Sequence, residues 1–212
     1  ARAAGAKDIR ILTPAEMKHP PEYELKPSDL LKLDGVQVVV YAGYERMVER
    51  LADAVRNRRL DAVRIDTTTS PQNLIDQTKK VAAVLGTDKE QKEWEKSFLQ
   101  RLDVLKARLV ALAGKRAVVH FHAQPFARWA GLTIVQVVPP GELSLKAVAD
   151  AVAKQPDVVI DILHLPVARV IADNARTRYA QVINFPAIQG TLTLEDIFEF
   201  NTGQLLKVMQ EK

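Results

Sequence analysis

Apolar and polar positions follow two periods along this chain, and these periods predict strands and helices in turn. Short β-branched runs such as VQVVVY at 36–41 are typical of strands buried on both faces of a parallel sheet. Other segments repeat their apolar residues every three or four positions, as amphipathic helices do. The pattern predicts strands over 9–12, 36–41, 60–65, 117–121, 132–138, 158–163 and 180–184, and helices over 28–33, 44–57, 71–85, 87–114, 125–129, 144–154, 166–176 and 193–209. This alternation predicts an α/β fold with ligand sites at the carboxyl ends of the strands.

The longest predicted helix, over 87–114, has a recognisable start and end. Thr87 and Glu90 form a capping box, and Gly114 follows the last apolar turn. Its apolar stripe consists of Trp94, Phe98, Leu102, Leu105, Leu109 and Leu112. Such a helix is roughly 40 Å long, enough to run the length of a small protein.

Similar strand and helix patterns flank this helix. We therefore expect an N-terminal α/β lobe over 1–86 and a C-terminal α/β lobe over 115–212, each with a mainly parallel sheet. The helix over 87–114 would join them as a rigid strut, with a ligand cleft between the lobes. The alternative is a single domain with one long surface helix.

Composition restricts the function classes. Of the 212 residues, 47% are hydrophobic and 26% charged, as in folded globular proteins, and no apolar run approaches the ~20 residues of a membrane span. The absence of cysteine excludes disulfides and thiolate metal sites. The net charge of +4 is spread among acidic residues and aromatic residues make up 6%, so nucleic acid is not an expected partner. The start at Ala1 without a signal-peptide pattern suggests a mature or truncated product.

All four histidines fall at or after the end of a predicted strand. They are His19, His120, His122 and His164, and Asp66 ends another strand. Imidazole and carboxylate groups are ligands for zinc, and they also serve manganese or iron. No single compact metal motif is present, but the shared placement predicts that these five side chains bind a metal ion.

At these residues the chain resembles the zinc/manganese substrate-binding proteins of bacterial ABC transporters, over nearly its whole length. The segments that carry the resemblance are HPPEYELKPSDLLKLDGVQVVVYAGYE, RIDTTTSPQNLIDQTKKVAAVL, VVHFHAQPFARWAGL, PPGELSLKAVADAV and VVIDILHLPVARVIAD. The resemblance implies two α/β lobes bridged by one long helix, with a metal ion in the cleft. The histidine-rich acidic loop of zinc members is absent.

The family's ligand positions carry over unevenly. The first family histidine falls on Pro21, with His19 two residues earlier. The second falls on Asp66, a carboxylate that remains a competent ligand. The third falls on His120, with His122 as an extra neighbour.

The fourth family ligand, an aspartate, falls near Asn184 and Phe185, and neither is a good metal ligand. His164 lies after a family glutamate position that is occupied here by Asp161, and it is a candidate substitute. The resemblance therefore implies the family scaffold with an altered ligand set.

The resemblance implies a periplasmic or extracellular receptor, with no enzymatic activity, that captures zinc, or alternatively manganese or iron, and delivers it to an ABC transporter permease. We expect a monomer that meets the membrane only through the permease or a lipid anchor.

Two alternatives remain open. One keeps the receptor architecture but binds a metal chelate or a small organic ligand. The other is a metal-dependent hydrolase, suggested by the HFH segment at a strand end, with Glu45 or Asp161 as general base. A hydrolase barrel needs more strand-helix units than could follow His120.

Overall fold

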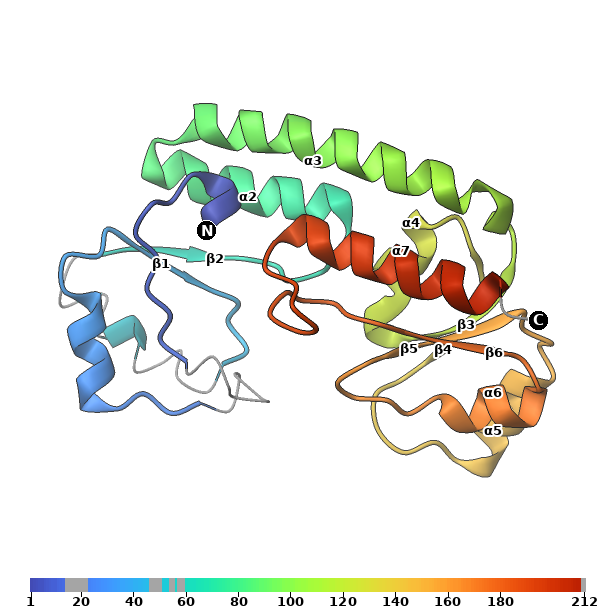
Figure 1. Cartoon of the computed structure of the whole chain (residues 1–212). Helices are drawn as coiled ribbons and strands as arrows, with labels where there is room; N and C mark the ends of the chain where they lie inside the picture. Colours follow the sequence, from blue (N-terminus) through green and yellow to red (C-terminus); the bar gives the residue numbers. More distant parts are fainter. Residues whose placement is uncertain (14–22, 46–50, 54–55, 57–59, 211–212) are drawn as a thin grey trace. The chain divides into compact units, whose positions relative to one another are not determined.

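The chain adopts an α/β fold, shown in Figure 1 as a computed structural model that describes residues 1–13, 23–45, 51–53, 56 and 60–210. The helices are α2 (Pro71–Leu85), α3 (Asp88–Leu109), α4 (Gln124–Trp129), α5 (Leu145–Val152), α6 (Arg169–Ala175) and α7 (Leu194–Gln210). The strands are β1 (Val38–Tyr41), β2 (Asp61–Arg64), β3 (Arg116–His120), β4 (Thr133–Val138), β5 (Val158–Ile162) and β6 (Arg178–Val182). No helix in the described ranges is long and apolar enough to cross a membrane.

The chain divides into two compact units. Unit 1 comprises residues 1–67 and 72–97, and unit 2 comprises residues 68–71 and 98–212. The boundary falls inside α3, so this continuous helix contributes its first half to unit 1 and its second half to unit 2.

Unit 1 is built on a two-stranded parallel sheet, in which Val38 of β1 pairs with Asp61 of β2. Successive β1 side chains alternate between two apolar clusters, as strand geometry requires. Val38 and Val40 pack towards Val81 and Ala82 of α2, whereas Val39 belongs to a second cluster. The second cluster also contains Tyr23, Leu25, Leu33 and Leu51. Both faces of β1 are therefore covered, as the β-branched run predicts.

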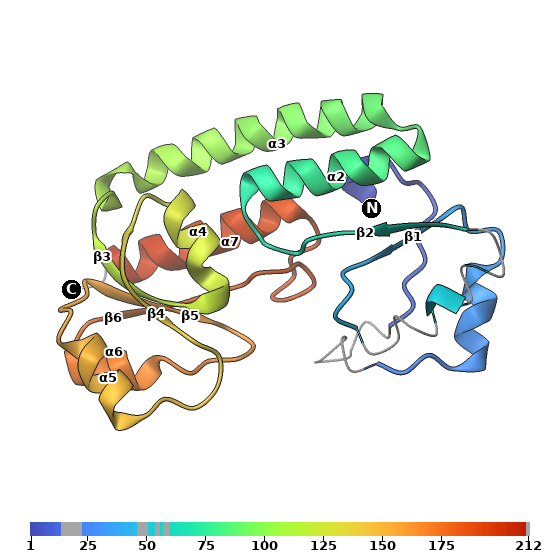
Figure 2. The same ribbon diagram turned by 180° about the vertical axis from the view of Figure 1, so that it is seen from behind.

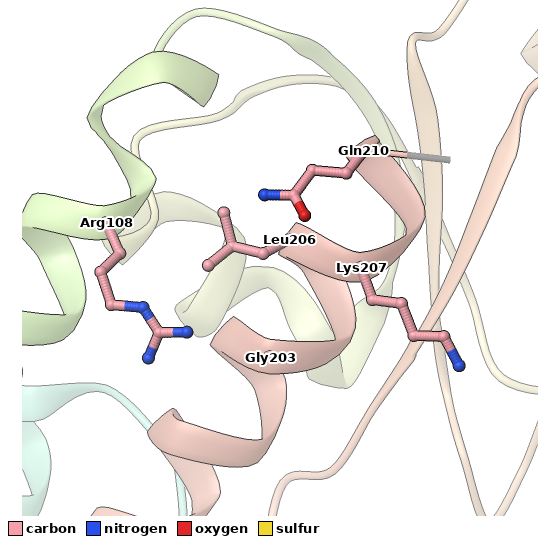
Figure 3. A pocket seen from close by; sticks show the side chains of 5 residues that line it. All are labelled: Arg108, Gly203, Leu206, Lys207 and Gln210. Carbon is pink, nitrogen blue, oxygen red and sulfur yellow. The ribbon is translucent and has the colours of Figure 1, made fainter. Parts of the chain in front are cut away.

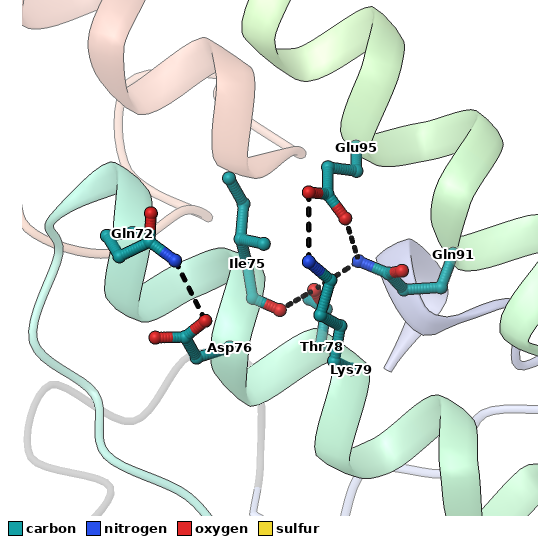
Figure 4. Close-up of polar contacts among 7 residues, drawn as sticks. All are labelled: Gln72, Ile75, Asp76, Thr78, Lys79, Gln91 and Glu95. Carbon is teal, nitrogen blue, oxygen red and sulfur yellow. Dashed lines mark hydrogen bonds and ion pairs between the residues drawn. The ribbon is translucent and has the colours of Figure 1, made fainter.

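A polar network joins α2 to the first turns of α3 inside unit 1 (Figure 4). The Gln91 side chain, 2% exposed, donates hydrogen bonds to Thr78 Oγ1 at 3.3 Å and to Glu95 Oε2 at 3.1 Å. Lys79 pairs with the other Glu95 oxygen at 3.0 Å, and this contact is the main cause that lowers the pKa of Glu95. These bonds satisfy polar groups that would otherwise be costly to bury.

Unit 2 is a three-layer structure around a four-stranded sheet. The strand order is β4-β3-β5-β6, and every pairing is parallel. Within this unit, α4 and α7 lie on one face of the sheet and α5 and α6 on the other, as Figures 1 and 2 both show. β5 is completely buried, as expected for a central strand covered on both faces.

Aromatic and aliphatic packing fix these layers. On the side of α7, the Phe198 ring makes edge contacts with Phe98 of α3 at 5.8 Å and Trp129 of α4 at 5.0 Å between centroids. On the other side, Val118 and Val159 pack with Ile171 of α6 in one buried cluster. Packed helices on both faces therefore fix the positions of the strand ends.

The structure corrects one predicted strand, over 9–12, and the end of one predicted helix, over 87–114. The segment 9–12 is not a strand: Ile9 and Ile11 are exposed, and Arg10 is held by hydrogen bonds to the carbonyl oxygens of Lys32 and Asp34. The predicted helix 87–114 is α-helical only to Leu109 and continues as a 3₁₀ turn over Val110–Leu112.

Smaller differences concern element boundaries. α6 begins three residues after the predicted start, because Asp161 holds the preceding turn, and β6 lies two residues earlier than predicted. The predicted helix 44–57 falls largely outside the described residues. The predicted start of the last helix is confirmed, since Thr193 and Asp196 cap α7.

Candidate functional site

Three strands of unit 2 bring candidate ligands to one edge of the sheet. His120 is the last residue of β3, His164 follows β5, and Asn184 follows β6. Because these strands are parallel, their carboxyl ends lie at the same edge. The fold thus gathers in one place residues that are up to 64 positions apart (184 − 120) in the sequence.

Among the candidate ligands that the structure describes, His120 is the most buried, with no exposed surface. Its Nδ1 accepts a hydrogen bond from the backbone N–H of His122 at 3.2 Å, which caps the 3₁₀ turn Phe121–Ala123. Its Nε2 is buried and has no hydrogen-bond partner in the described part of the chain. Burial lowers the pKa of His120, the charge of Asp161 opposes this shift, and His122 adds to it. A neutral imidazole results, which is the form that binds metals.

Asp161 lies near His120, but its carboxylate already accepts hydrogen bonds from other groups of the protein. Its two oxygens accept four hydrogen bonds, from the backbone N–H groups of Ile162, Val167 and Ala168 and from the Tyr179 hydroxyl. Burial and then the Asp161 charge raise the pKa of Tyr179, which keeps this hydroxyl protonated as a donor. Asp161 therefore fixes the loop between β5 and α6.

The other two histidines of unit 2 pack against phenylalanine rings. His122 is exposed, with its ring centroid 5.5 Å from that of His120 and 5.2 Å from that of Phe121. His164 is half-buried and makes an edge contact with Phe185 at 4.8 Å. The structure thus brings His120 and His122 together. Among the residues it describes, it shows no group of three or more His, Asp or Glu side chains placed to hold a metal ion.

Asn184 is a further candidate ligand, although the comparison with the family's ligand positions did not favour it. Its Oδ1 is buried without a hydrogen-bond partner in the described ranges, and its backbone carbonyl accepts a bond from Thr69 Oγ1 at 2.5 Å. An amide oxygen is a metal donor, though a weaker one than a carboxylate. In the sequence, Asn184 could have been chosen because it follows the last strand, where the family has an aspartate ligand.

The two candidates of unit 1 differ in what the structure shows. Asp66 is exposed just beyond β2, and amide side chains of α2 hold its backbone. Gln77 Oε1 accepts from the Asp66 N–H at 3.2 Å, and Asn73 Nδ2 donates to the Asp66 carbonyl at 3.1 Å. His19 lies outside the described residues.

The two bases proposed for a hydrolase both have structural roles. Asp161 is saturated as described above. Glu45 accepts hydrogen bonds from the N–H groups of Ala42 at 2.9 Å and Gly43 at 2.6 Å, which closes the turn after β1. Both carboxylates therefore already accept hydrogen bonds from backbone N–H groups.

A separate hollow of about 450 Å³ opens between α3 and α7 in unit 2 (Figure 3). It is lined by Arg108, Gly203, Leu206, Lys207 and Gln210. None of the candidate ligands lines it, so it is distinct from the histidine-bearing edge.

Comparison with known proteins gives matches among solved structures alone: no family model and no curated protein matches the chain. The substrate-binding protein (SBP) FpvC of Pseudomonas aeruginosa in complex with Ni²⁺ is 19% identical, with a TM-score of 0.68 over 94% of this chain and 87% of FpvC. ZnuA is 16% identical, with a TM-score of 0.71 over 99% and 94% of the two chains.

Zn(II)-bound AdcA of Streptococcus pneumoniae is 15% identical, with a TM-score of 0.65; the match covers this whole chain but 55% of AdcA. At such identities the likeness establishes the fold. The chain shares with FpvC, ZnuA and AdcA the α/β fold that the sequence resemblance implied.

Proposed function

We propose that the chain is the receptor of an ABC transporter, which captures a transition-metal ion, zinc in the first place, and delivers it to a membrane permease. The observation that supports this proposal most directly is His120. Its imidazole is buried at the carboxyl end of a strand, and Nε2 has no hydrogen-bond partner in the described residues, so this nitrogen can bind a metal ion once it has lost its proton.

The proposed ligands are His19, Asp66, His120, His122 and His164. Asn184 Oδ1 is a further donor at the same edge of the unit 2 sheet, because it is buried and unpartnered in the described ranges. The proposed ligands in unit 2 include no carboxylate, since the hydrogen bonds of Asp161 occupy its oxygens.

This donor set supports zinc over manganese. Imidazole nitrogen suits zinc and nickel, whereas manganese prefers carboxylate and other oxygen ligands. The Irving–Williams order also places zinc above manganese for a given site of nitrogen and oxygen donors. We therefore expect zinc to bind more tightly than manganese.

The proposal includes location and partner. An ABC receptor of this kind works in the periplasm or at the outer face of the cell membrane and docks on its permease as a monomer. The solute-binding fold and the structural roles of Glu45 and Asp161 favour a receptor over an enzyme.

The direct test is calorimetric titration of metal-free protein with zinc and with manganese. We expect zinc to bind with submicromolar affinity and His120→Phe, which keeps a ring but removes both nitrogens, to weaken binding by roughly 100-fold. Thr202→Val is the matched control, because Thr202 Oγ1 is also buried and unpartnered in the described residues but is no proposed ligand. Zinc binding no tighter than micromolar would contradict the proposal.

A metal chelate is the second candidate ligand, and one observation favours it. Phe121 is 53% exposed and Phe185 is 36% exposed, and both contact histidines at the carboxyl edge of the unit 2 sheet. Exposed aromatic rings beside a metal ligand suit the organic part of a chelate. Elemental analysis and native mass spectrometry of the protein as purified separate the two: a bare ion adds the mass of the metal alone.

A further inference from the structure

The hydrogen bond between His122 and His120 fixes where His120 carries its proton. The His122 N–H donates to Nδ1, so Nδ1 has no proton of its own. A neutral imidazole has one N–H, and this proton must therefore be on Nε2. There it is buried and meets no acceptor in the described residues.

Metal capture conflicts with this hydrogen bond whichever nitrogen is used. If Nε2 binds the ion, its proton must leave and Nδ1 becomes the protonated nitrogen, so two N–H groups would face each other. If Nδ1 binds the ion, the metal takes the lone pair that the His122 N–H now occupies. Metal-binding histidines almost always donate their second N–H, and here the second nitrogen accepts.

We infer that the turn from His120 to His122 opens when His120 takes a metal ion, so that the His122 N–H leaves Nδ1. This inference rests on the proposed metal-binding function and adds that the turn from His120 to His122 changes conformation when the ion binds. The His122 backbone is a positioning group, which holds the metal-free tautomer of His120 and competes with the metal.

The surroundings of the turn permit a movement of this kind. Phe121 and His122 are both exposed and touch each other, so their shift opens no buried core. Ala123, 1% exposed, and α4 after it remain packed against the unit 2 sheet. A bond from Gln124 Nε2 to the Phe121 carbonyl, 3.0 Å long and exposed, is a further contact that must adjust.

The test is nuclear magnetic resonance of the full chain labelled with ¹⁵N, before and after one equivalent of zinc. Without metal, the ring of His120, identified by the signals lost in His120→Gln, is expected to be the Nε2–H tautomer. With zinc, the exchange rate of the His122 amide is expected to rise roughly tenfold, as the loss of one hydrogen bond implies.

The chain supplies a matched control amide. The Ala147 N–H donates to Ser144 Oγ at 3.2 Å, the same length and also at a helix start, but in α5 on the other face of the sheet. Its exchange rate should not change with zinc. His122→Ala keeps the backbone N–H, so it should retain the Nε2–H tautomer of His120.

The outcomes separate the inference from the proposed function. Zinc bound with an unchanged His122 amide, or an Nδ1–H tautomer in the metal-free protein, would overturn the inference alone. Absence of any zinc binding by calorimetry would overturn the proposed function and the inference with it.

Discussion

Asp29 shows at the residue scale how a single carboxylate holds a loop of unit 1. It is 4% exposed and accepts hydrogen bonds from the Tyr23 hydroxyl at 2.6 Å and the Lys26 N–H at 3.0 Å, and it pairs with Lys32 at 2.9 Å. The Tyr23 bond first, then those of Lys26 and Lys32, lower the pKa of Asp29 to about 2. The folded state therefore favours the ionised form.

This shift predicts how acid acts on stability. Because the folded pKa lies below the ordinary value of 3.8, Asp29 contributes stability above pH 3.8 and loses it as the pH falls to about 2. Asp29→Asn should lower the free energy of unfolding at neutral pH, and its difference from the wild type should shrink across that range. Urea unfolding at several pH values measures this. A difference independent of pH would contradict it, and exposed Asp53→Asn is the control.

At the scale of elements, the apolar stripe of α3 decides where this helix packs. Phe98, Leu102, Leu105 and Leu109 are all at most 3% exposed, as the spacing predicts. Leu105→Ala should cost about 2–5 kcal/mol of unfolding free energy, because it removes a buried side chain and leaves a cavity. Leu99→Ala on the same helix, where the side chain is 42% exposed, should cost less than about 1 kcal/mol. Chemical denaturation measures both, and equal losses would contradict the assigned face.

The strands and helices that depend on local pattern were predictable from the sequence. β5 and α2 match their predicted ranges closely, because a short β-branched run and a long, regular amphipathic period are strong local signals. The segment 9–12 was not predictable in this way: a strand needs a neighbouring strand, and in the described residues this segment pairs with neither β1 nor β2. The same limit applies to the end of α3, where three more apolar residues form a 3₁₀ turn.

The candidate site was predictable only in part, for a related reason. His120 could be found from the sequence because it ends a buried strand. The saturation of Asp161 by four donors and the buried Oδ1 of Asn184 depend on contacts between β5, β6 and their loops, which no local pattern encodes. Buried polar atoms that have no partner in the described residues thus add candidates, such as Asn184, that residue type alone does not suggest.

At the scale of the whole molecule, binding of the proposed metal ion and folding of the chain are coupled. Asp66 belongs to unit 1 and His120 to unit 2. An ion that binds the folded chain and not the unfolded one must raise the free energy of unfolding. Zinc at 100 times its dissociation constant should add about 2.7 kcal/mol. For a chain of this length the thermal midpoint should rise by roughly 5–10 °C.

The variants show which unit contributes to this stabilisation. His120→Phe should reduce the zinc-dependent gain to about 0.4 kcal/mol at the same zinc concentration, and Asp66→Ala should also reduce it, because each removes a proposed ligand. Asp76→Ala is the matched control: Asp76 is another exposed carboxylate of unit 1, on α2, and its contact is with Gln72. Thermal unfolding followed by circular dichroism, with zinc and then with excess chelator, measures all three. If Asp66→Ala behaves as Asp76→Ala does, while His120→Phe loses most of the effect, then unit 2 holds the ion without Asp66, and the ligand set must be reduced accordingly.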